Sequence, residues 1–167
     1  CDPHVVHQPR TSVIVPVYNK APHLKACFDC LECQTISKSD LEVLLIDDGS
    51  TDDSLALCEA FAAERPWVRV IAQPNAGVSE ARNAGIRAAN GRYLFFLDPD
   101  DSLSPETLEN VSMFFESCPD EIDLVTYPIV SIRDGKRQRL HHRYDVLRET
   151  GVYDLTLPEN ATVAQAT

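Results

Sequence analysis

The feature that most constrains the fold is a regular alternation of short apolar runs with longer amphipathic stretches. Continuous apolar runs are typical of strands covered on both faces, as in a parallel sheet. We expect strands at residues 12–17, 41–46, 67–71 and 93–97. The stretches with helical periodicity are 21–34, 52–64, 78–89 and 105–116. Strand and helix in succession predict right-handed crossovers and a doubly wound α/β sheet.

Beyond residue 116 the alternation weakens. We expect one more strand at 122–127, and a hairpin joining 129–133 to 138–142, because Asp134-Gly-Lys136 is a turn signal. The predicted organisation is an N-terminal tail over 1–10, one domain over 11–150, and a poorly ordered tail over 151–167, where the residues are small and polar.

Charge limits the partners that such a surface can attract. The formal net charge is −11, which argues against nucleic acid and anionic lipid as partners. No apolar run reaches the ~18 residues that a membrane span requires, so we expect no span in this chain. An anionic substrate would therefore need a local source of attraction, such as a bound cation or a helix N-terminus.

Cysteines invite a disulfide or metal interpretation, since the chain has six. Cys27, Cys30 and Cys33 are three residues apart on a predicted helix, which suggests one broad shared face. A metal or cluster site would want a fourth ligand and the short loops that usually supply such ligands. We expect small packing residues in a reduced, cytosolic compartment instead.

Acidic residues follow two of the predicted strands. Asp47 and Asp48 end the second strand, and Asp98-Pro-Asp-Asp101 follows the fourth. Ligands of open parallel sheets bind at the carboxyl ends of the strands. Clustered carboxylates repel one another unless a cation or hydrogen-bond donors offset them, and Mg²⁺ or Mn²⁺ shared with a substrate phosphate would do so. The alternative is a role in turns and helix caps, which we favour for Asp52, Asp53 and Ser102.

The segment 75–85 is a third unusual feature. Gly77 permits a tight entry into the following helix, whose exposed amides could face an anion. Arg82 could form an ion pair with a phosphate or with Asp98. Gly85 in mid-helix costs about 1 kcal/mol against alanine, so we expect something to pack close to it. The alternative is an ordinary helix with a solvated arginine.

Four segments in order carry a family resemblance. They read Ser-Val-Ile-Val-Pro-Val-Tyr-Asn from residue 12, Glu-Val-Leu-Leu-Ile-Asp-Asp-Gly-Ser-Thr-Asp from 42, Asn-Ala-Gly-Val-Ser-Glu-Ala-Arg-Asn-Ala-Gly from 75, and Tyr-Leu-Phe-Phe-Leu-Asp-Pro-Asp-Asp from 93. Together they resemble the inverting glycosyltransferase family 2 over residues 11–108. The resemblance implies a GT-A fold, a Rossmann-like three-layer α/β/α sandwich with a mostly parallel central sheet.

The resemblance also implies roles for individual residues. Pro16 and Tyr18 would line the base pocket, and Asp48 would hydrogen-bond the base edge, with Asp47 behind it in a structural role. Gly77 would lie against the substrate, and Arg82 would contact the nucleotide or brace the acidic loop.

The acidic loop would hold the metal. Asp98 would face the ribose or the metal, Asp100 would be the principal ligand of Mn²⁺ or Mg²⁺, and Asp101 would assist. The cation would neutralise the diphosphate leaving group. The donor would be a nucleoside diphosphate sugar, most often UDP-linked, and the acceptor a glycan or a lipid-linked glycan in bacterial surface-polysaccharide synthesis. The implied location is cytoplasmic, at the inner membrane face through parts of the full-length protein outside this chain.

An inverting transfer also needs a general base, and none can be assigned. The late acids Glu149, Asp154 and Glu159 stand in no recognisable base motif. We expect the base to lie beyond the chain end, so that this hexosyltransferase-type chain binds donor weakly and transfers sugar poorly. His4, His7, His141 and His142 are expected to be solvated or in turns.

Three other classes remain open at this point. A phosphoacceptor receiver domain would place its acidic pair after the first strand and need a late lysine, but Lys136 lies in a predicted turn. A haloacid-dehalogenase-type phosphatase would place its aspartate loop on the first strand. A non-catalytic module that binds a nucleotide sugar within a larger protein is the third alternative.

Overall fold

The computed structural model describes residues 8–117, 132–133 and 136–137. The chain divides into two compact units, with the boundary between Glu116 and Ser117, and each is described by itself. The strands of the first unit are β1 (Thr11–Val17), β2 (Leu41–Asp47), β3 (Val68–Ala72) and β4 (Tyr93–Phe96). The helices are α1 (Ala21–Glu32), α2 (Ser54–Ala62), α3 (Val78–Ala88) and α4 (Thr107–Ser117).

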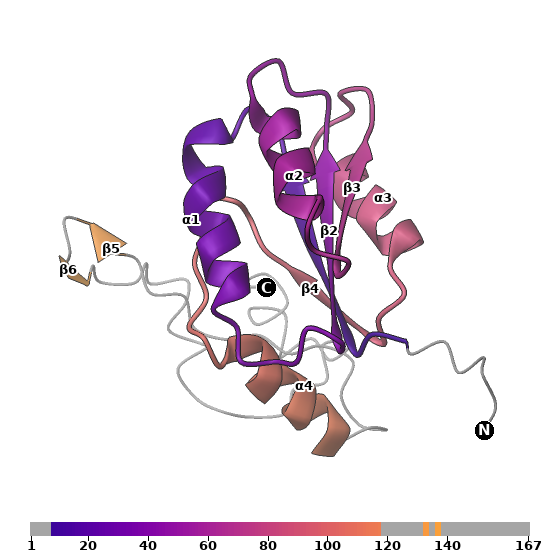
Figure 1. The fold of residues 1–167 in the computed structure, drawn as a ribbon, viewed down its shortest axis with the longest axis vertical. Helices are drawn as coiled ribbons and strands as arrows, with labels where there is room; N and C mark the ends of the chain where they lie inside the picture. The colour runs from indigo at the N-terminus through magenta and orange to yellow at the C-terminus, as the bar shows by residue number, and fades with distance from the viewer. Residues whose placement is uncertain (1–7, 118–131, 134–135, 138–167) are drawn as a thin grey trace, which may run out of the picture. The chain divides into compact units, whose positions relative to one another are not determined.

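The four strands form one parallel sheet in the order β3-β2-β1-β4 (Figure 1). Every residue of β1 and β2, the two central strands, is buried. Val17 is paired with Asp47, so the two central strands end together at one edge. This confirms the predicted parallel α/β sheet, and it brings the loops that follow β1 and β2 side by side.

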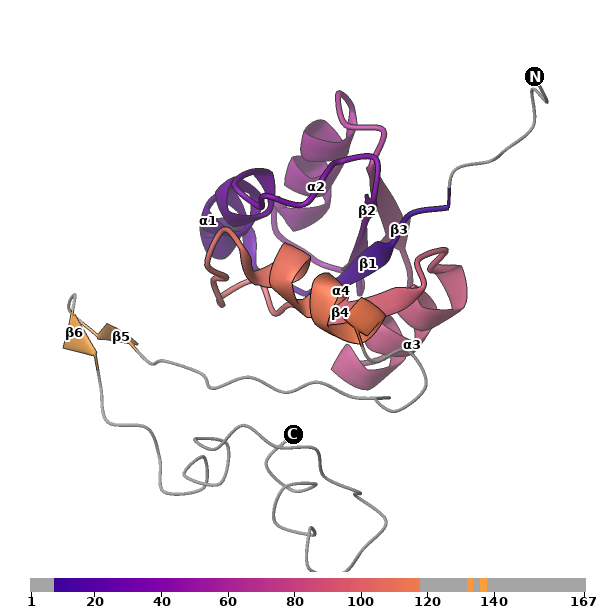
Figure 2. The ribbon, with the colours of Figure 1, turned by 90° about the horizontal axis from the view of Figure 1, so that it is seen from below.

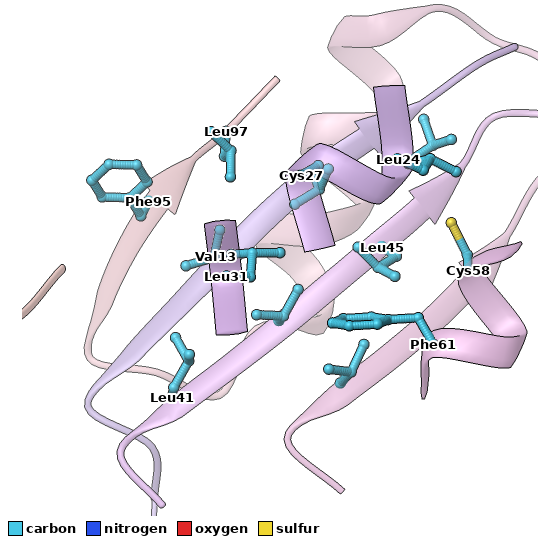
Figure 3. Packing of buried hydrophobic residues seen from close by; sticks show 14 of the residues in the cluster. Val13, Leu24, Cys27, Leu31, Leu41, Leu45, Cys58, Phe61, Phe95 and Leu97 are labelled. Atoms are coloured by element: carbon cyan, nitrogen blue, oxygen red, sulfur yellow. The ribbon is translucent and has the colours of Figure 1, made fainter. Parts of the chain in front are cut away.

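Helices cover both faces of the sheet (Figures 1 and 2). Because side chains alternate along a strand, Val13 and Val15 join a core with α1, α2 and α4, whereas Ile14 packs on the other face against α3. Figure 3 shows the first of these cores, with Leu24 of α1 and Phe61 of α2 over the sheet. Full burial of one such side chain stabilises the fold by about 1.5–3 kcal/mol. The predicted three-layer sandwich is confirmed.

Close packing of α3 on β1 explains the glycine in mid-helix. A Cβ atom on Gly85 would lie 2.4 Å from Cγ2 of Ile14. Real Cβ atoms do not approach that closely, so only glycine lets α3 lie at this distance from the sheet. The expectation that something packs close to Gly85 is confirmed.

Helix boundaries differ from the sequence prediction by about two residues. Helix α2 begins at Ser54 rather than at 52, because Asp52 accepts a hydrogen bond from the Ser54 amide and so lies outside the helix as a cap. Asp53 lies in the N-cap position, as expected, although its side chain makes no cap hydrogen bond. Helix α4 begins at Thr107 rather than at Pro105, and the Thr107 amide donates to the Ser104 carbonyl in a turn that precedes it.

The second unit contains a short hairpin, in which β5 (Ile132–Arg133) pairs antiparallel with β6 (Lys136–Arg137). A hairpin at this turn signal is confirmed, although its second strand begins at 136 rather than at 138. The predicted strand 122–127 and the tail 151–167 lie outside the described residues. So do Glu149, Asp154, Glu159 and the four histidines at 4, 7, 141 and 142.

The cysteines of α1 do not share one face. Cys27 is buried, Cys30 is partly buried, and Cys33 is exposed at the C-cap. At 3.6 residues per turn, each step of three residues rotates the position by about 60°, so two steps carry it from core to solvent. Burial raises the pKa of the Cys27 thiol to about 12. Cys27 is therefore a packing residue, as expected.

Within residues 8–117, no helix is long and apolar enough to cross a membrane.

Candidate functional site

A cavity of about 460 Å³ opens at the carboxyl edge of the sheet. Its lining comes from the end of β1, from the loops after β1, β2, β3 and β4, and from the start of α3. The residues are Pro16, Val17, Tyr18, Lys20, Asp48, Asn75, Gly77, Val78, Ala81, Asp98, Pro99 and Asp100. The predicted base, substrate and metal residues Pro16, Tyr18, Asp48, Gly77, Asp98 and Asp100 thus border one space.

A second cavity, of about 520 Å³, lies at the opposite end of β2 and β3 and is larger. Its cations are already engaged. Lys38 donates to three carbonyl oxygens at the end of α1, and Arg69 pairs with Glu42 at 2.8 Å. We therefore regard the cavity at the carboxyl edge as the candidate site, since its polar groups converge on open space.

Asp48 is held by three hydrogen-bond donors of the protein. Oδ1 accepts from Gln73 Nε2 at 2.7 Å and from the Ala76 amide at 2.9 Å, and Oδ2 accepts from the Gly77 amide at 2.8 Å. Burial of the carboxyl group acts to raise its pKa, but these three bonds outweigh it and leave the pKa below the ordinary value. Asp48 is therefore ionised and fixed in direction at neutral pH.

Two amides that precede α3, those of Ala76 and Gly77, face the Asp48 carboxylate. That exposed amides of the helix itself face an anion stays a prediction. Gly77 has φ +92°, a left-handed backbone in which glycine is favoured. The turn lets two successive amides point at one side chain. Gly77 thus lines the cavity and also orients Asp48.

Asp47 lies beneath the cavity rather than on its wall. Its side chain is buried, and Oδ2 accepts from the Ser50 amide at 3.2 Å. Within residues 8–117, Oδ1 of Asp47 has no hydrogen-bond partner. The placement agrees with the structural role that we expected for the first acid of the pair.

The loops after β1 and β2 are tied together by Asn19. Its side-chain Oδ1 accepts from the amides of Thr51 and Asp52, and its own amide donates to Ser50 Oγ. Asn19 has φ +51°, which asparagine tolerates better than most residues. The cross-links fix the backbone on either side of Asn19, and so position Tyr18 and Lys20 at the cavity.

Tyr18 is 47% exposed, an unusual value for a large aromatic residue beside a buried strand. It lines the cavity together with Pro16, the last residue but one of β1. An exposed ring next to a proline offers an apolar wall on which a planar group can stack.

The acidic loop after β4 is held by two cations from elsewhere in the fold. Arg82 Nη2 lies 2.8 Å from Asp98 Oδ1, which confirms the ion pair that the sequence suggested. Lys20 Nζ lies 2.8 Å from Asp100 Oδ2. Sequence reasoning missed Lys20, because nothing in its local pattern links it to a residue 80 positions later.

Both paired acids stay accessible, with side chains 43% exposed for Asp98 and 49% exposed for Asp100. Asp101 lies outside the lining of the cavity. The pKa of Asp101 is raised, first by loss of water around its carboxyl group and then by the negative charges of Asp98 and Asp100. The three carboxylates are thus close enough to repel one another, a repulsion that a cation would relieve.

The donor set of this loop fits a hard divalent ion that is completed by substrate. Carboxylate oxygens suit Mg²⁺ and Mn²⁺, and each paired acid has one oxygen outside its ion pair. Within the described part of the chain, no three His, Cys, Asp or Glu side chains gather as a metal-binding group.

Comparison with known proteins identifies relatives of the whole α/β unit. The family described as "Glycosyl transferase family 2" matches residues 12–165. The minor teichoic acid biosynthesis protein GgaB of Bacillus subtilis is 43% identical over 71% of this chain and 13% of its own length. The glycosyltransferase EpsJ of the same organism is 40% identical over 70% of this chain and 33% of its own. The hyaluronan synthase of Pasteurella multocida is 38% identical over 65% of this chain and 11% of its own.

Solved structures show the same fold. The first 349 residues of TarS from S. aureus, in complex with UDP, superpose with a TM-score of 0.61 at 30% identity, covering 65% of this chain and 32% of that one. A mannosyltransferase from Pyrobaculum calidifontis, in complex with GDP-Man and Mn²⁺, gives a TM-score of 0.60 at 28% identity, covering 66% of this chain and 33% of that one. The chain thus spans a third or less of the length of these relatives.

Proposed function

Because the chain belongs to glycosyl transferase family 2 and has the GT-A fold, we propose that it is the donor-binding part of a hexosyltransferase. The proposed donor is a nucleoside diphosphate sugar with uracil as its base. The proposed acceptor is a glycan or lipid-linked glycan in surface-polysaccharide synthesis. Because the chain belongs to this family, we set aside the receiver domain and the phosphatase as alternatives.

One observation carries the proposal: an ionised carboxylate with a fixed direction and a loop of accessible carboxylates border the same cavity. Asp48 lies at one side and Asp100 at the other, with the exposed ring of Tyr18 also on the wall. A nucleotide needs a planar apolar wall and a directed acceptor for its base. It also needs positive charge for its phosphates. The cavity offers the first two directly and the third through the acidic loop.

Asp48 is suited to recognise the edge of a base. A carboxylate has about four acceptor positions, and donors of the protein occupy three of those on Asp48. A ring N–H of the base would supply the fourth donor. Because Asp48 is already fixed and ionised, little reorganisation would accompany that bond.

Asp98 and Asp100, assisted by Asp101, would hold Mn²⁺ or Mg²⁺ at the acidic loop. When bound, such an ion supplies charge stabilisation for the diphosphate as it leaves the sugar. In this chain Arg82 orients Asp98, and the repulsion among the three acids favours a cation beside them. The overall negative charge of the protein makes that local attraction necessary.

We further propose that the general base and most of the acceptor site belong to parts of the full-length protein outside this chain. The chain would then bind donor weakly and transfer sugar poorly. A cytoplasmic location, at the inner membrane face through other parts of the protein, belongs to the same proposal.

Nucleotide binding tests the proposal directly. UDP, GDP, dTDP and CDP, each with and without Mn²⁺, are titrated against the chain while its melting temperature is followed. Ligand at 100 times its dissociation constant stabilises the native state by about 2.7 kcal/mol. We expect UDP with Mn²⁺ to raise the melting temperature most.

Two variants localise the effect. Asp100→Ala should abolish the dependence of UDP binding on Mn²⁺. Asp29→Ala removes a carboxylate of α1 that pairs with Lys25 and should leave that dependence intact. If no nucleotide shifts the melting temperature of the unaltered chain, the proposed function is wrong.

A further inference from the structure

Lys20 is the unexpected charged residue of the cavity. It lines the wall, and its ammonium group lies 2.8 Å from Asp100, the residue proposed as principal metal ligand. An ammonium at this carboxylate neutralises part of the charge that would attract a divalent ion, and it repels an ion bound at the other carboxylate oxygen. The structure therefore shows the Lys20 ammonium beside Asp100, where the proposed function requires a divalent ion.

The backbone of Lys20 is held by neighbouring segments, whereas its side chain is held at its tip by one partly exposed ion pair. The Lys20 amide donates to Ser54 Oγ at 2.9 Å, and the preceding residue, Asn19, is tied to Thr51. The side chain lines the cavity with 34% of its surface exposed, and its ammonium group donates a hydrogen bond to Asp100. A lysine side chain on a fixed backbone can exchange one anion for another without disturbing the fold.

Asp98 and Asp100 form ion pairs with different cations. Arg82 comes from α3, on one side of the sheet, and pairs with Asp98. Lys20 comes from the loop before α1 and pairs with Asp100. Asp101 adds negative charge beside them. Without Lys20, Asp100 would lose its ion-pair partner while the carboxylates of Asp98 and Asp101 stay close, in a protein of net charge −11.

We propose that Lys20 is the internal counter-cation of Asp100: it competes with a divalent ion for this carboxylate when the cavity is empty, and binds the diphosphate when donor and ion are present together. This inference rests on the proposed function of the cavity. A nucleoside diphosphate leaving group carries more negative charge than one divalent ion offsets, and the Lys20 ammonium, with its three donors, is already on the cavity wall.

Competition predicts that removal of Lys20 tightens binding of the ion alone. Free Mn²⁺ is titrated with the 167-residue chain in the absence of nucleotide and followed by electron paramagnetic resonance. We expect Lys20→Met to bind Mn²⁺ on the order of ten-fold more tightly than the unaltered chain, because it removes both a competing ion pair and a like-charge repulsion. Lys20→Arg keeps the charge and should bind Mn²⁺ as weakly as the unaltered chain.

Lys25→Met is the matched control. It removes the same charge, by the same substitution, from a lysine that pairs with Asp29 and does not line the cavity. Its effect on Mn²⁺ affinity should be about two-fold at most, since charges at exposed positions are screened. An equal gain in Lys20→Met and Lys25→Met would overturn the inference, and so would the absence of any gain in Lys20→Met.

The proposed contact between Lys20 and the diphosphate predicts that removal of Lys20 weakens the binding of UDP. At saturating Mn²⁺, calorimetry should show that Lys20→Met binds UDP on the order of ten-fold more weakly, because the diphosphate loses a charged donor. A purely structural role for Lys20 would weaken both Mn²⁺ and UDP binding, and that result would contradict the inference.

The two proposals fail in different ways. If UDP binds with Mn²⁺ but Lys20→Met does not change the affinity for Mn²⁺ alone, the inference is wrong and the proposed function stands. If Lys20→Met gains affinity for Mn²⁺ but no nucleotide binds any variant, the competition is real, and both the diphosphate role of Lys20 and the proposed function are wrong.

Discussion

Two acidic loops border one cavity, and the fold holds them by different means. After β2, Asp48 is fixed by two backbone amides and one side-chain amide and is almost fully buried. After β4, Asp98 and Asp100 are held by Arg82 and Lys20, and their carboxylates stay about half exposed.

This difference separates a rigid side of the cavity from an adjustable one. Backbone amides cannot leave Asp48 unless the turn at Gly77 moves, so its carboxylate is preorganised. Long cationic side chains can leave Asp98 and Asp100 at small cost, because exposed ion pairs contribute only about 0–1 kcal/mol. A rigid side suits the invariant edge of a base, and an adjustable side suits a diphosphate whose charge changes during transfer.

Removal of the Asp48 carboxylate should have the largest effect on stability. Asp48→Ala leaves Gln73 and the amides of Ala76 and Gly77 without their acceptor. We expect a loss of about 3 kcal/mol in the free energy of unfolding, since donors left unsatisfied by a missing charged partner are costly. Urea unfolding followed by circular dichroism measures this value.

The variant Asp100→Ala tests whether the loop after β4 is less firmly held than the loop after β2. It removes an exposed carboxylate with a single lysine partner. Its unfolding free energy should stay within about 0.5 kcal/mol of the unaltered chain. Comparable losses in Asp48→Ala and Asp100→Ala would show that both loops are equally fixed.

A second, smaller effect should follow from the packing of α3. Alanine at position 85 has the better helix propensity, but its Cβ would meet Ile14. We expect Gly85→Ala to destabilise the chain by about 2 kcal/mol, as overpacked cores do. The shifted helix would also displace the Gly77 turn, so UDP affinity should fall through the rigid side. Asn83→Ala, at an exposed position of the same helix, should change stability by less than about 0.5 kcal/mol.

A further small effect on stability should come from Arg82. Arg82→Ala removes a partly exposed ion pair and should cost about 0.5 kcal/mol, yet it leaves Asp98 without its orienting cation. We expect UDP affinity at saturating Mn²⁺ to fall by roughly ten-fold in calorimetry, about the effect of one lost charge-assisted contact. Arg87→Ala, which breaks the exposed pair with Glu80 on the same helix, should leave that affinity unchanged.

The fold could be predicted from local patterns, because they report burial directly. The apolar runs of β1 and β2 are continuous since both strands lie in the centre of a covered sheet. The poor helix propensity of Gly85 predicted a close contact, although the sequence could not identify Ile14 as the partner. Helix starts were displaced where side chains such as Asp52 act as caps rather than as first-turn residues. The prediction that Cys27, Cys30 and Cys33 share one face was wrong, because two steps of three residues turn the position from the core to the solvent.

The acids of the candidate site were also visible in the sequence, because carboxylates directly after apolar strands have few structural explanations. What the sequence could not supply was the set of partners. Lys20 is 80 positions from Asp100, and the sequence around either residue does not indicate that the two form a pair. The three donors of Asp48 are 25 to 29 residues away and include two backbone amides, which carry no sequence signal.

The sequence by itself thus determined the parallel sheet, the edge at which its loops gather and the sign of the charges found there. Only the tertiary structure decided which acid is locked and which can be released. The physical reason is that periodicity and composition record whether a residue is buried, a property of each position alone. The freedom of a carboxylate depends on which donors reach it, a property of pairs that the folded chain brings together.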